Sequence, residues 1–197
     1  MIDDLTDTPT DLKQKLCSQR LSTILLDRDG VLNIESSSFI KRPAEWLPID
    51  RAMTAVAKLQ QHFQLAVCTN QSGIGRQLFT LSQLDAIHQK LQSQLQQAGG
   101  QCIDIFFCPH LPEQGCDCRK PAPGLLAAAM THFSASPDTT LFVGDSQRDI
   151  EAGLAAGCHV ALVQTGNGQT TAVQLAKQNI SVPVWSDLAA LTADLIG

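Results

Sequence analysis

The chain has 197 residues, 44% of them hydrophobic and 17% charged, which excludes a disulfide-stapled miniprotein and predicts one globular domain with its own core. The net charge of −5 argues against a nucleic-acid partner. No apolar run reaches the about 18 residues of a membrane span, and the polar opening lacks a signal-peptide core, so we expect a cytoplasmic protein with no membrane partner. The seven cysteines are an odd number, which favours a reducing compartment.

The opening residues differ in composition from the rest of the chain. They carry Leu12 and Leu16 at loosely helical spacing. Before and among these lie acidic residues with threonine and proline: Asp3, Asp4, Asp7 and Asp11. The pattern indicates a mobile tail or a short helix over residues 1–20, followed by one domain over residues 21–197. We assign the extension no function and expect a monomer.

A short apolar strand predicted at residues 23–26 ends at two carboxylates, Asp27 and Asp29. Successive apolar and β-branched residues are typical of a parallel strand covered on both faces, and ligands of open α/β sheets bind at the carboxyl ends of such strands. Gly30 lets the chain turn just beyond, so the two acids can converge. A divalent cation such as Mg²⁺ would relieve their repulsion. The alternative for a lone Asp-x-Asp-Gly is an aspartate that caps a turn.

The next segments predict a loop, a helix and a second strand. Residues 34–48 lack periodicity and contain Pro43 and Pro48, which indicates a loop folded over the site. Its polar residues either touch the substrate or form a solvated surface: Ser36, Ser37, Ser38, Lys41 and Arg42. Apolar residues at helical spacing predict a helix from residue 50 onward, and residues 65–68 predict a strand.

The second strand ends in a polar turn, Thr69-Asn70-Gln71-Ser72-Gly73. Its hydroxyl and amide groups suit an anionic oxygen, although such residues are also common in ordinary turns. Thr80 and Gln83 then predict a capping box for a helix that ends at Gly99-Gly100. Isolated histidines more often belong to a core or a surface than to a site, so four are left out of it: His62, His88, His132 and His159.

The sharpest spacing in the chain follows a third strand predicted at residues 103–107. Three cysteines and a histidine lie within eleven residues: Cys108, His110, Cys116 and Cys118. This donor set matches the closed shell of structural Zn²⁺, and the lack of a spare ligand position argues against catalytic zinc. The alternative is incidental or reactive cysteines. Arg119 and Lys120 follow directly, and two cations held by a metal loop suit phosphate and a second polar group.

The carboxy-terminal part repeats the pattern of a strand that delivers acids. A helix at residues 123–133 precedes a strand at 140–143, which ends in Gly144-Asp145-Ser146-Gln147-Arg148-Asp149. Asp145 is a further candidate metal ligand, whereas Asp149 fits a place behind a ligand or at a helix N-terminus as well as direct coordination. Strands at 160–163 and 182–185 alternate with helices near 171–178 and after Ser186, the expected cap of the last helix. The fold class is therefore α/β, with a doubly wound, mostly parallel sheet.

Four motifs in this order resemble the haloacid dehalogenase (HAD) phosphatase superfamily over nearly everything after residue 20. They are residues 27–33, the Thr69 turn, Lys120 and Gly144-Asp145. The resemblance implies a Rossmann-like HAD fold. The motifs leave no room for a separate cap domain, so the zinc-binding loop and residues 34–48 would wall an open site. The cysteine-histidine loop narrows the resemblance to phosphatases of heptose bisphosphates, whose close relatives act on histidinol phosphate.

The resemblance also implies a role for each motif. Asp27 would be the nucleophile that forms a phosphoaspartate, Asp29 the acid and base, and Thr69 and Lys120 the groups that steady the phosphoryl group. Mg²⁺ would bind Asp27, the backbone carbonyl of Asp29, and Asp145. The substrate-binding residues would be Asn70, Gln71, Ser72 and Arg119. Independently, hydrolysis through a carboxyl phosphate needs one carboxylate to attack and another to move protons.

The implied substrate is a phosphorylated sugar, with loss of the C7 phosphate of a heptose 1,7-bisphosphate in lipopolysaccharide core or related heptose nucleotide biosynthesis. Two alternatives stay open: a histidinol-phosphate phosphatase and a non-catalytic phosphate-binding or scaffold protein. The intact pair Asp27 and Asp29 argues against the second. Some relatives have lysine where this chain has Ser146, so Ser146 receives no substrate role.

Overall fold

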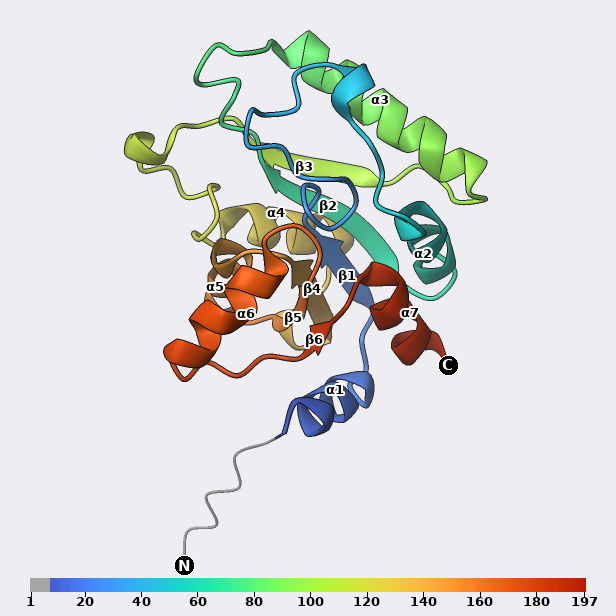
Figure 1. Ribbon diagram of the computed structural model, residues 1–197. Coiled ribbons are helices and arrows are strands. Elements are labelled where there is room, and N and C mark those ends of the chain that lie inside the picture. The colour runs from blue at the N-terminus through green and yellow to red at the C-terminus, as the bar shows by residue number, and fades with distance from the viewer. Residues whose placement is uncertain (1–7) are drawn as a thin grey trace, which may run out of the picture.

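The computed structural model describes residues 8–197 and places a parallel sheet between two layers of helices (Figure 1). The strand order is β3-β2-β1-β4-β5-β6, and every pairing is parallel. The strands are β1 Thr23–Leu26, β2 Gln64–Asn70, β3 Asp104–Cys108, β4 Thr140–Gly144, β5 His159–Val163 and β6 Val184–Trp185. The doubly wound α/β fold is confirmed. The second strand runs two residues further than predicted because Thr69 and Asn70 still pair with β3.

The helices are α1 Pro9–Cys17, α2 Ala52–Leu59, α3 Leu81–Gln97, α4 Gly124–Phe133, α5 Gln147–Ala155, α6 Gly168–Lys177 and α7 Leu188–Ile196. Alternation along β1 sorts them into two layers. Ile24 and Leu26 share a core with residues of α2, α3 and α7. Leu25 faces the opposite core, which includes residues of α4 and α5. The central strand is therefore buried on both faces.

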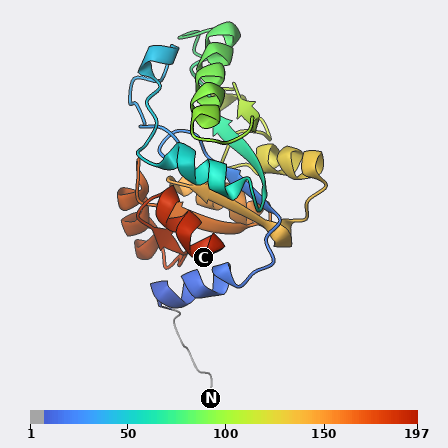
Figure 2. The same ribbon diagram turned by 90° about the vertical axis from the view of Figure 1, so that its right-hand side faces the viewer.

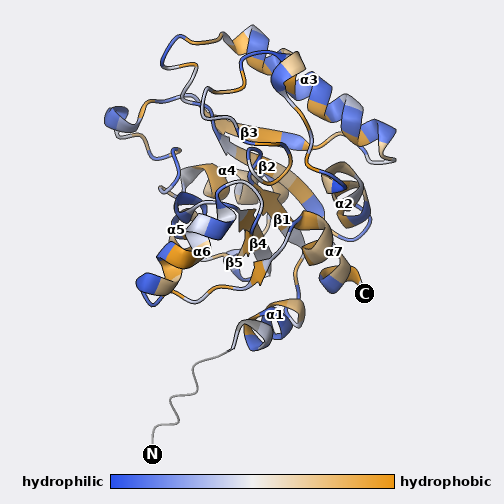
Figure 3. Cartoon of the chain, viewed as in Figure 1, coloured by the Kyte–Doolittle hydropathy of each residue, from blue (hydrophilic) through white to orange (hydrophobic). Residues whose placement is uncertain are grey.

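Helix α3 is amphipathic, so only one of its faces needs to be apolar. Its buried residues are Leu84, Ile87, Leu91 and Leu95, at the spacing of one helical face. The rest of the helix is largely hydrophilic (Figure 3). The predicted capping box is confirmed: Thr80 Oγ1 accepts from the Gln83 backbone N–H at 3.2 Å, and the Thr80 N–H donates to Gln83 Oε1 at 2.8 Å.

The start of the last helix differs from expectation, whereas the start of α5 lies close to where it was expected. The last helix is capped by Asp187, whose Oδ1 accepts from the Ala190 N–H at 2.7 Å, so the prediction of Ser186 was wrong. Asp187 also pairs with Arg51 at 3.1 Å, a contact across 136 residues that local sequence does not reveal. Helix α5 begins at Gln147, two residues before Asp149, which the sequence placed at a possible helix N-terminus. This start puts Asp149 in the first turn.

The amino-terminal segment forms the predicted short helix over part of its length. Thr8 caps α1 through a capping box with Asp11, and Leu16 joins the core. Helix α1 lies at the end of the molecule opposite α3 in both views (Figure 2). Asp3, Asp4 and Asp7 lie outside the described residues. A boundary between residues 20 and 21 stays a prediction.

Two long loops lie beyond the carboxyl ends of the strands. Residues 34–48 form the predicted loop, with a single 3-10 turn at Pro43–Glu45 and a fully buried Trp46 as its anchor. The loop after β3 contains another 3-10 turn, Pro112–Gln114. Within residues 8–197, no helix is both long enough and apolar enough to cross a bilayer.

Candidate active site

The carboxyl ends of the central strands bring the predicted chemical groups to one cavity. Leu26 of β1 is paired with Val67 of β2 and with Val143 of β4, so the residues that follow these positions converge. The cavity is lined by all four predicted catalytic residues and by two of the other predicted site residues: Asp27, Asp29, Thr69, Lys120, Asn70 and Asp145. Distant segments thus assemble one polar site.

Lys120 is the buried cation of this cavity, with only 2% of its surface exposed. Its Nζ lies 2.8 Å from Asp27 Oδ1 and 2.6 Å from Asp149 Oδ1. Burial alone would lower the pKa of Lys120, but Asp149 and Asp27 outweigh it and raise that pKa. The ammonium therefore stays charged and joins the end of β1 to the start of α5.

Three buried carboxylates gather beside Lys120. Oxygens of Asp27, Asp145 and Asp149 lie within 4.8 Å of one another. Burial, followed by the charge of Asp149, raises the pKa of Asp27 to about 7. Burial, followed by the charge of Asp27, raises the pKa of Asp145 to about 8. Buried like charges favour a bound proton or cation, and carboxylate oxygens are ligands that suit Mg²⁺.

Gly30 permits the close approach on which Asp145 depends. Its φ is +82°, and a Cβ there would lie 2.1 Å from Asp145 Oδ2. Any larger residue would therefore clash with this carboxylate and strain the turn. The turn predicted after the two acids is observed, and it also makes room for the acid that follows β4.

Asp149 lies at the helix N-terminus and beside the candidate metal ligands, while its direct coordination of a metal stays a prediction. It is the third residue of α5, and its Oδ2 accepts from the Ser146 backbone N–H at 3.0 Å and from Ser146 Oγ at 2.6 Å. Its other oxygen faces Lys120. It also belongs to the carboxylate cluster. The Ser146 hydroxyl is taken up by this cap.

Asp29 lies in the same cavity but faces different partners. Its carboxylate receives bonds from Arg28 Nη2 at 3.0 Å, Asn33 Nδ2 at 2.9 Å and Gln71 Nε2 at 2.9 Å. Burial pushes its pKa upward, but Arg28, Asn33 and Gln71 together pull it below the ordinary value. Its carboxylate does not belong to the side-chain cluster of Asp27, Asp145 and Asp149. A metal contact through its backbone carbonyl stays a prediction.

Of the residues predicted to bind substrate, some are engaged in hydrogen bonds within the protein and others line a cavity. The Asn70 amide is engaged on both sides by the Lys120 backbone, at 3.0 and 3.1 Å, and so holds the loop that carries this lysine. Gln71 Nε2 also donates to Thr69 Oγ1 at 3.0 Å. Ser72 and Arg119 line a second cavity, which adjoins the first and shares Asp29 and Asn70 with it. The loop residue Ser36 lines it too, whereas Lys41 and Arg42 pair with Glu45.

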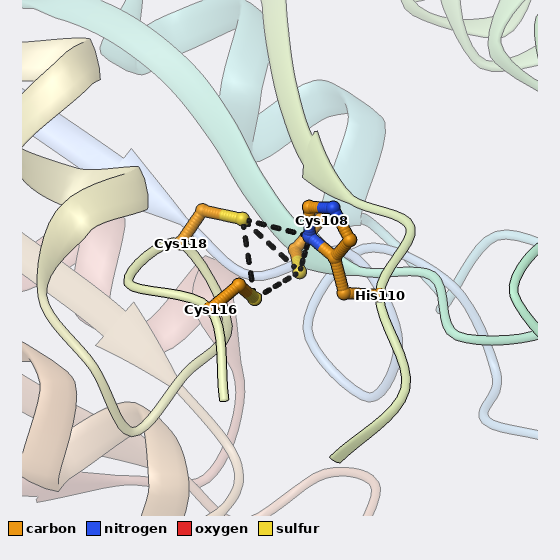
Figure 4. Close-up of side chains that lie close together, drawn as sticks. All are labelled: Cys108, His110, Cys116 and Cys118. Carbon is orange, nitrogen blue, oxygen red and sulfur yellow. Dashed lines mark hydrogen bonds between the residues drawn. The ribbon is translucent and has the colours of Figure 1, made fainter. Parts of the chain in front are cut away.

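The four predicted zinc ligands converge at the end of β3, whose last residue is Cys108, and in the loop that follows (Figure 4). The Sγ atoms of Cys108 and Cys118 lie 3.3 Å apart, and Cys116 Sγ lies 3.6 and 3.5 Å from them. His110 Nδ1 lies 3.5 Å from Cys108 and 3.3 Å from Cys118. All these cysteines are free thiols. Around a tetrahedral zinc, sulfur ligands about 2.3 Å from the ion would lie about 3.7 Å apart, and a nitrogen at about 2.0 Å would lie about 3.5 Å from each sulfur, so the donor set fits that ion.

Several residues of the site were missed by sequence reasoning. Glu35, Arg148 and Asn167 line the first cavity. Glu35 contacts the Asn167 amide, and the Asn167 backbone N–H donates to Asp145 Oδ2 at 2.7 Å. Arg148 could have been predicted, because it lies within the motif that follows β4. Asn167 could not, because only the folded chain brings the turn after β5 next to the end of β4.

Comparisons with known proteins agree with this geometry. The family described as HAD-hydrolase-like matches residues 117–191. A D-glycero-beta-D-manno-heptose-1,7-bisphosphate 7-phosphatase of Pseudomonas putida is 41% identical over 177 residues, which cover 89% of this chain and 100% of that protein. The chain belongs to the HAD phosphatases. A second such relative, from Neisseria meningitidis, is 45% identical over 155 residues, covering 78% of this chain and 83% of its own.

A solved structure extends the likeness of this HAD phosphatase to the whole fold. The D,D-heptose 1,7-bisphosphate phosphatase of Bordetella bronchiseptica, complexed with magnesium and phosphate, has a TM-score of 0.84 and 42% identity. The likeness covers 89% of this chain and 98% of that one. The enzyme of Burkholderia thailandensis gives a TM-score of 0.69 at 34% identity, covering 89% and 99%. The resemblance seen in the sequence motifs is confirmed.

Proposed function

We propose that this HAD phosphatase removes the C7 phosphate of D-glycero-D-manno-heptose 1,7-bisphosphate through an aspartyl-phosphate on Asp27. The observation that carries the chemistry is the placement of Asp27, Asp29 and Lys120 in one cavity beside a buried acidic cluster. The substrate follows from the activity for which the relatives are named, and these relatives align over 89% of the chain. Such a step belongs to heptose nucleotide or lipopolysaccharide core synthesis.

The first half-reaction transfers the phosphoryl group to the protein. A carboxylate oxygen of Asp27 attacks phosphorus, and the bond from phosphorus to the C7 oxygen breaks. Asp29, in its protonated form, gives a proton to the leaving alkoxide. Lys120 lies 2.8 Å from Asp27 and favours the ionised form of the attacking group, while the Thr69 hydroxyl faces the same cavity.

The second half-reaction restores the protein. Asp29, now a carboxylate, takes a proton from water as that water attacks phosphorus, and Asp27 is released together with inorganic phosphate. Arg28 and its neighbours lower the pKa of Asp29, which keeps it in the carboxylate form that accepts the proton of the attacking water. Mg²⁺ held by Asp27, Asp145 and the Asp29 carbonyl would offset the negative charge of the phosphoryl group.

The substrate assignment is tested by initial rates on heptose 1,7-bisphosphate and on histidinol phosphate. We expect much higher kcat/KM on the heptose compound, with heptose 1-phosphate as the product. A preference for histidinol phosphate would replace the proposal with its nearest alternative. Turnover of neither compound, in the presence of Mg²⁺, would favour a phosphate-binding protein.

Arg119 is expected to contribute to recognition rather than to the reaction at phosphorus. It lines the second cavity, and its Nη1 donates to the His110 carbonyl at 3.3 Å, so the cysteine-histidine loop holds it. We expect Arg119→Ala to lower kcat/KM for heptose 1,7-bisphosphate much more than for a small phosphate ester, because guanidinium binds a second polar group of the larger substrate. Arg42→Ala, at a residue paired with Glu45, is the control. Equal losses on both substrates would contradict the assignment.

We propose that the cysteine-histidine loop binds one structural Zn²⁺ through Cys108, His110, Cys116 and Cys118. Zinc binding to peptide sites is worth about 10 to 16 kcal/mol, so we expect Cys118→Ser to lose the metal and to lower the melting temperature. Cys102→Ser changes an exposed cysteine outside the cluster and should leave both unchanged. Elemental analysis measures the zinc content of each protein, and thermal unfolding measures its melting temperature. Zinc-free wild type, or a Cys118→Ser protein with full zinc content, would count against the site.

A further inference from the structure

Arg28 is a buried charge that takes no part in the bond changes of the proposed reaction. It stands between the two acids in sequence, with 1% of its surface exposed. Its backbone N–H donates to Asp27 Oδ1 at 2.7 Å, and its Nη2 lies 3.0 Å from both oxygens of Asp29. A buried guanidinium loses hydration worth several kcal/mol, which only well-aligned partners offset. The geometry of this one residue therefore affects both acids.

The carboxylate of Asp29 is held from three directions. Arg28 contacts both oxygens, Asn33 Nδ2 donates to Oδ1, and Gln71 Nε2 donates to Oδ2. Asn33 follows on the same turn, and Gln71 comes from the end of β2. Arg28 supplies the charged contact, so a rotation of its guanidinium would turn the Asp29 carboxylate.

His88 of α3 lies on the other side of that guanidinium. Its Nε2 is 3.4 Å from Arg28 Nη1. Arginine only donates, so Nε2 must accept, and a neutral His88 carries its proton on Nδ1. Burial, followed by the charge of Arg28, lowers the pKa of His88 to about 4, which keeps the ring neutral. The ring also packs edge-on against Phe107 of β3, with the centroids 6.0 Å apart.

Helix α3 fixes where this imidazole stands. Ile87 and Leu91, on either side of His88 in the helix, are buried in the core shared with α2 and β1. His88 itself is half-buried and does not line the first or the second cavity. It therefore contacts the Arg28 guanidinium from the protein interior and not from the cavities open to a substrate.

From these contacts we infer that His88 is a positioning residue for Asp29, acting through the guanidinium of Arg28. The inference rests on the proposed role of Asp29 as acid and base. Without an acceptor at Nη1, the guanidinium loses a contact that fixes it from the side opposite Asp29, and the carboxylate bound to it is held less precisely toward the leaving oxygen. General acid–base help is worth about 10² to 10⁴ in rate, which sets the ceiling of the effect.

The test compares two leaving groups in the full-length protein with Mg²⁺ present. The alkoxide of heptose 1,7-bisphosphate needs a proton as it leaves, whereas 4-nitrophenolate from 4-nitrophenyl phosphate leaves without one. We compare kcat/KM, which reports the transfer to Asp27 and not the hydrolysis of the phosphoenzyme that both substrates share. We expect His88→Leu to lower kcat/KM on the heptose compound by about tenfold, within the range of general-acid effects, and to change kcat/KM on the aryl ester by less than about twofold. A general loosening of the fold would lower both rates alike.

His88→Gln is the matched control, because its amide oxygen offers an acceptor near the position of Nε2. It should keep the ratio of the two rates close to that of wild type. Asp29→Asn should shift the ratio in the same direction as His88→Leu, and further. If Asp29→Asn is selective for the heptose compound but His88→Leu slows both esters equally, the inference on His88 fails while the proposed function stands. Wild type that does not turn over the heptose compound would overturn both.

Discussion

Asp27→Asn is expected to abolish turnover while the protein still folds. The amide keeps the shape of the side chain but cannot form a stable acyl phosphate, so covalent catalysis is lost. Removal of the nucleophile of a serine protease, which also works through a covalent intermediate, costs about 10⁶ in kcat. The Arg28 backbone N–H can still donate to the amide oxygen, and Lys120 keeps Asp149 as its partner. Steady-state rates on heptose 1,7-bisphosphate measure the loss.

Thermal unfolding of the same Asp27→Asn preparation is the control for folding. Asp29→Asn provides the comparison within the site: it should lose about 10² to 10⁴ in rate, because it removes proton transfer but leaves the nucleophile. Asp27→Asn activity within an order of magnitude of wild type would show that another group attacks phosphorus. A collapse of the fold in Asp27→Asn would instead assign this residue a structural role.

Lys120→Met is expected to impair both stability and activity. The ammonium lies 2.8 Å from Asp27 and 2.6 Å from Asp149, all three being buried. Removing one partner of a buried ion pair leaves uncompensated charge and costs about 3 to 5 kcal/mol. Chemical unfolding in Mg²⁺-free buffer measures this free energy, and turnover should fall on large and small phosphate esters alike.

Lys58→Met is the matched control for Lys120→Met, since Lys58 is an exposed helical lysine. Its free energy of unfolding should stay within about 0.5 kcal/mol of wild type, as for other surface changes. Added Mg²⁺ should stabilise Lys120→Met more than it stabilises wild type, because the cation then faces carboxylates that no longer have a lysine. An unfolding free energy equal to that of wild type would contradict the view of Lys120 as the charge that holds the site together.

Much of the site could be predicted because its groups follow strands directly. Asp27 ends an apolar run, Asp145 ends another, and parallel strands deliver their carboxyl ends to one edge. The cysteine-histidine loop was predictable for a different reason: zinc ligands lie close together in sequence, and Cys108 and Cys118 are separated by ten residues.

The remaining contacts join segments that no local pattern relates. His88 meets Arg28 across 60 residues, and Asn70 holds the Lys120 backbone across 50. The turn residue Asn167 reaches Asp145 only after β4 and β5 have paired. Local sequence specified the elements, but these polar contacts depend on the tertiary packing between them.

The central claim is that Asp27 carries the phosphoryl group during turnover. The most direct measurement is rapid acid quenching of the enzyme with heptose 1,7-bisphosphate and Mg²⁺, followed by intact mass and peptide analysis. Wild type should gain the mass of one phosphoryl group on the peptide that contains Asp27, labile at neutral pH, and Asp27→Asn should gain none. A phosphoryl group found on any other residue, or turnover with no trapped phosphoenzyme in Asp29→Asn as well as in wild type, would contradict the account.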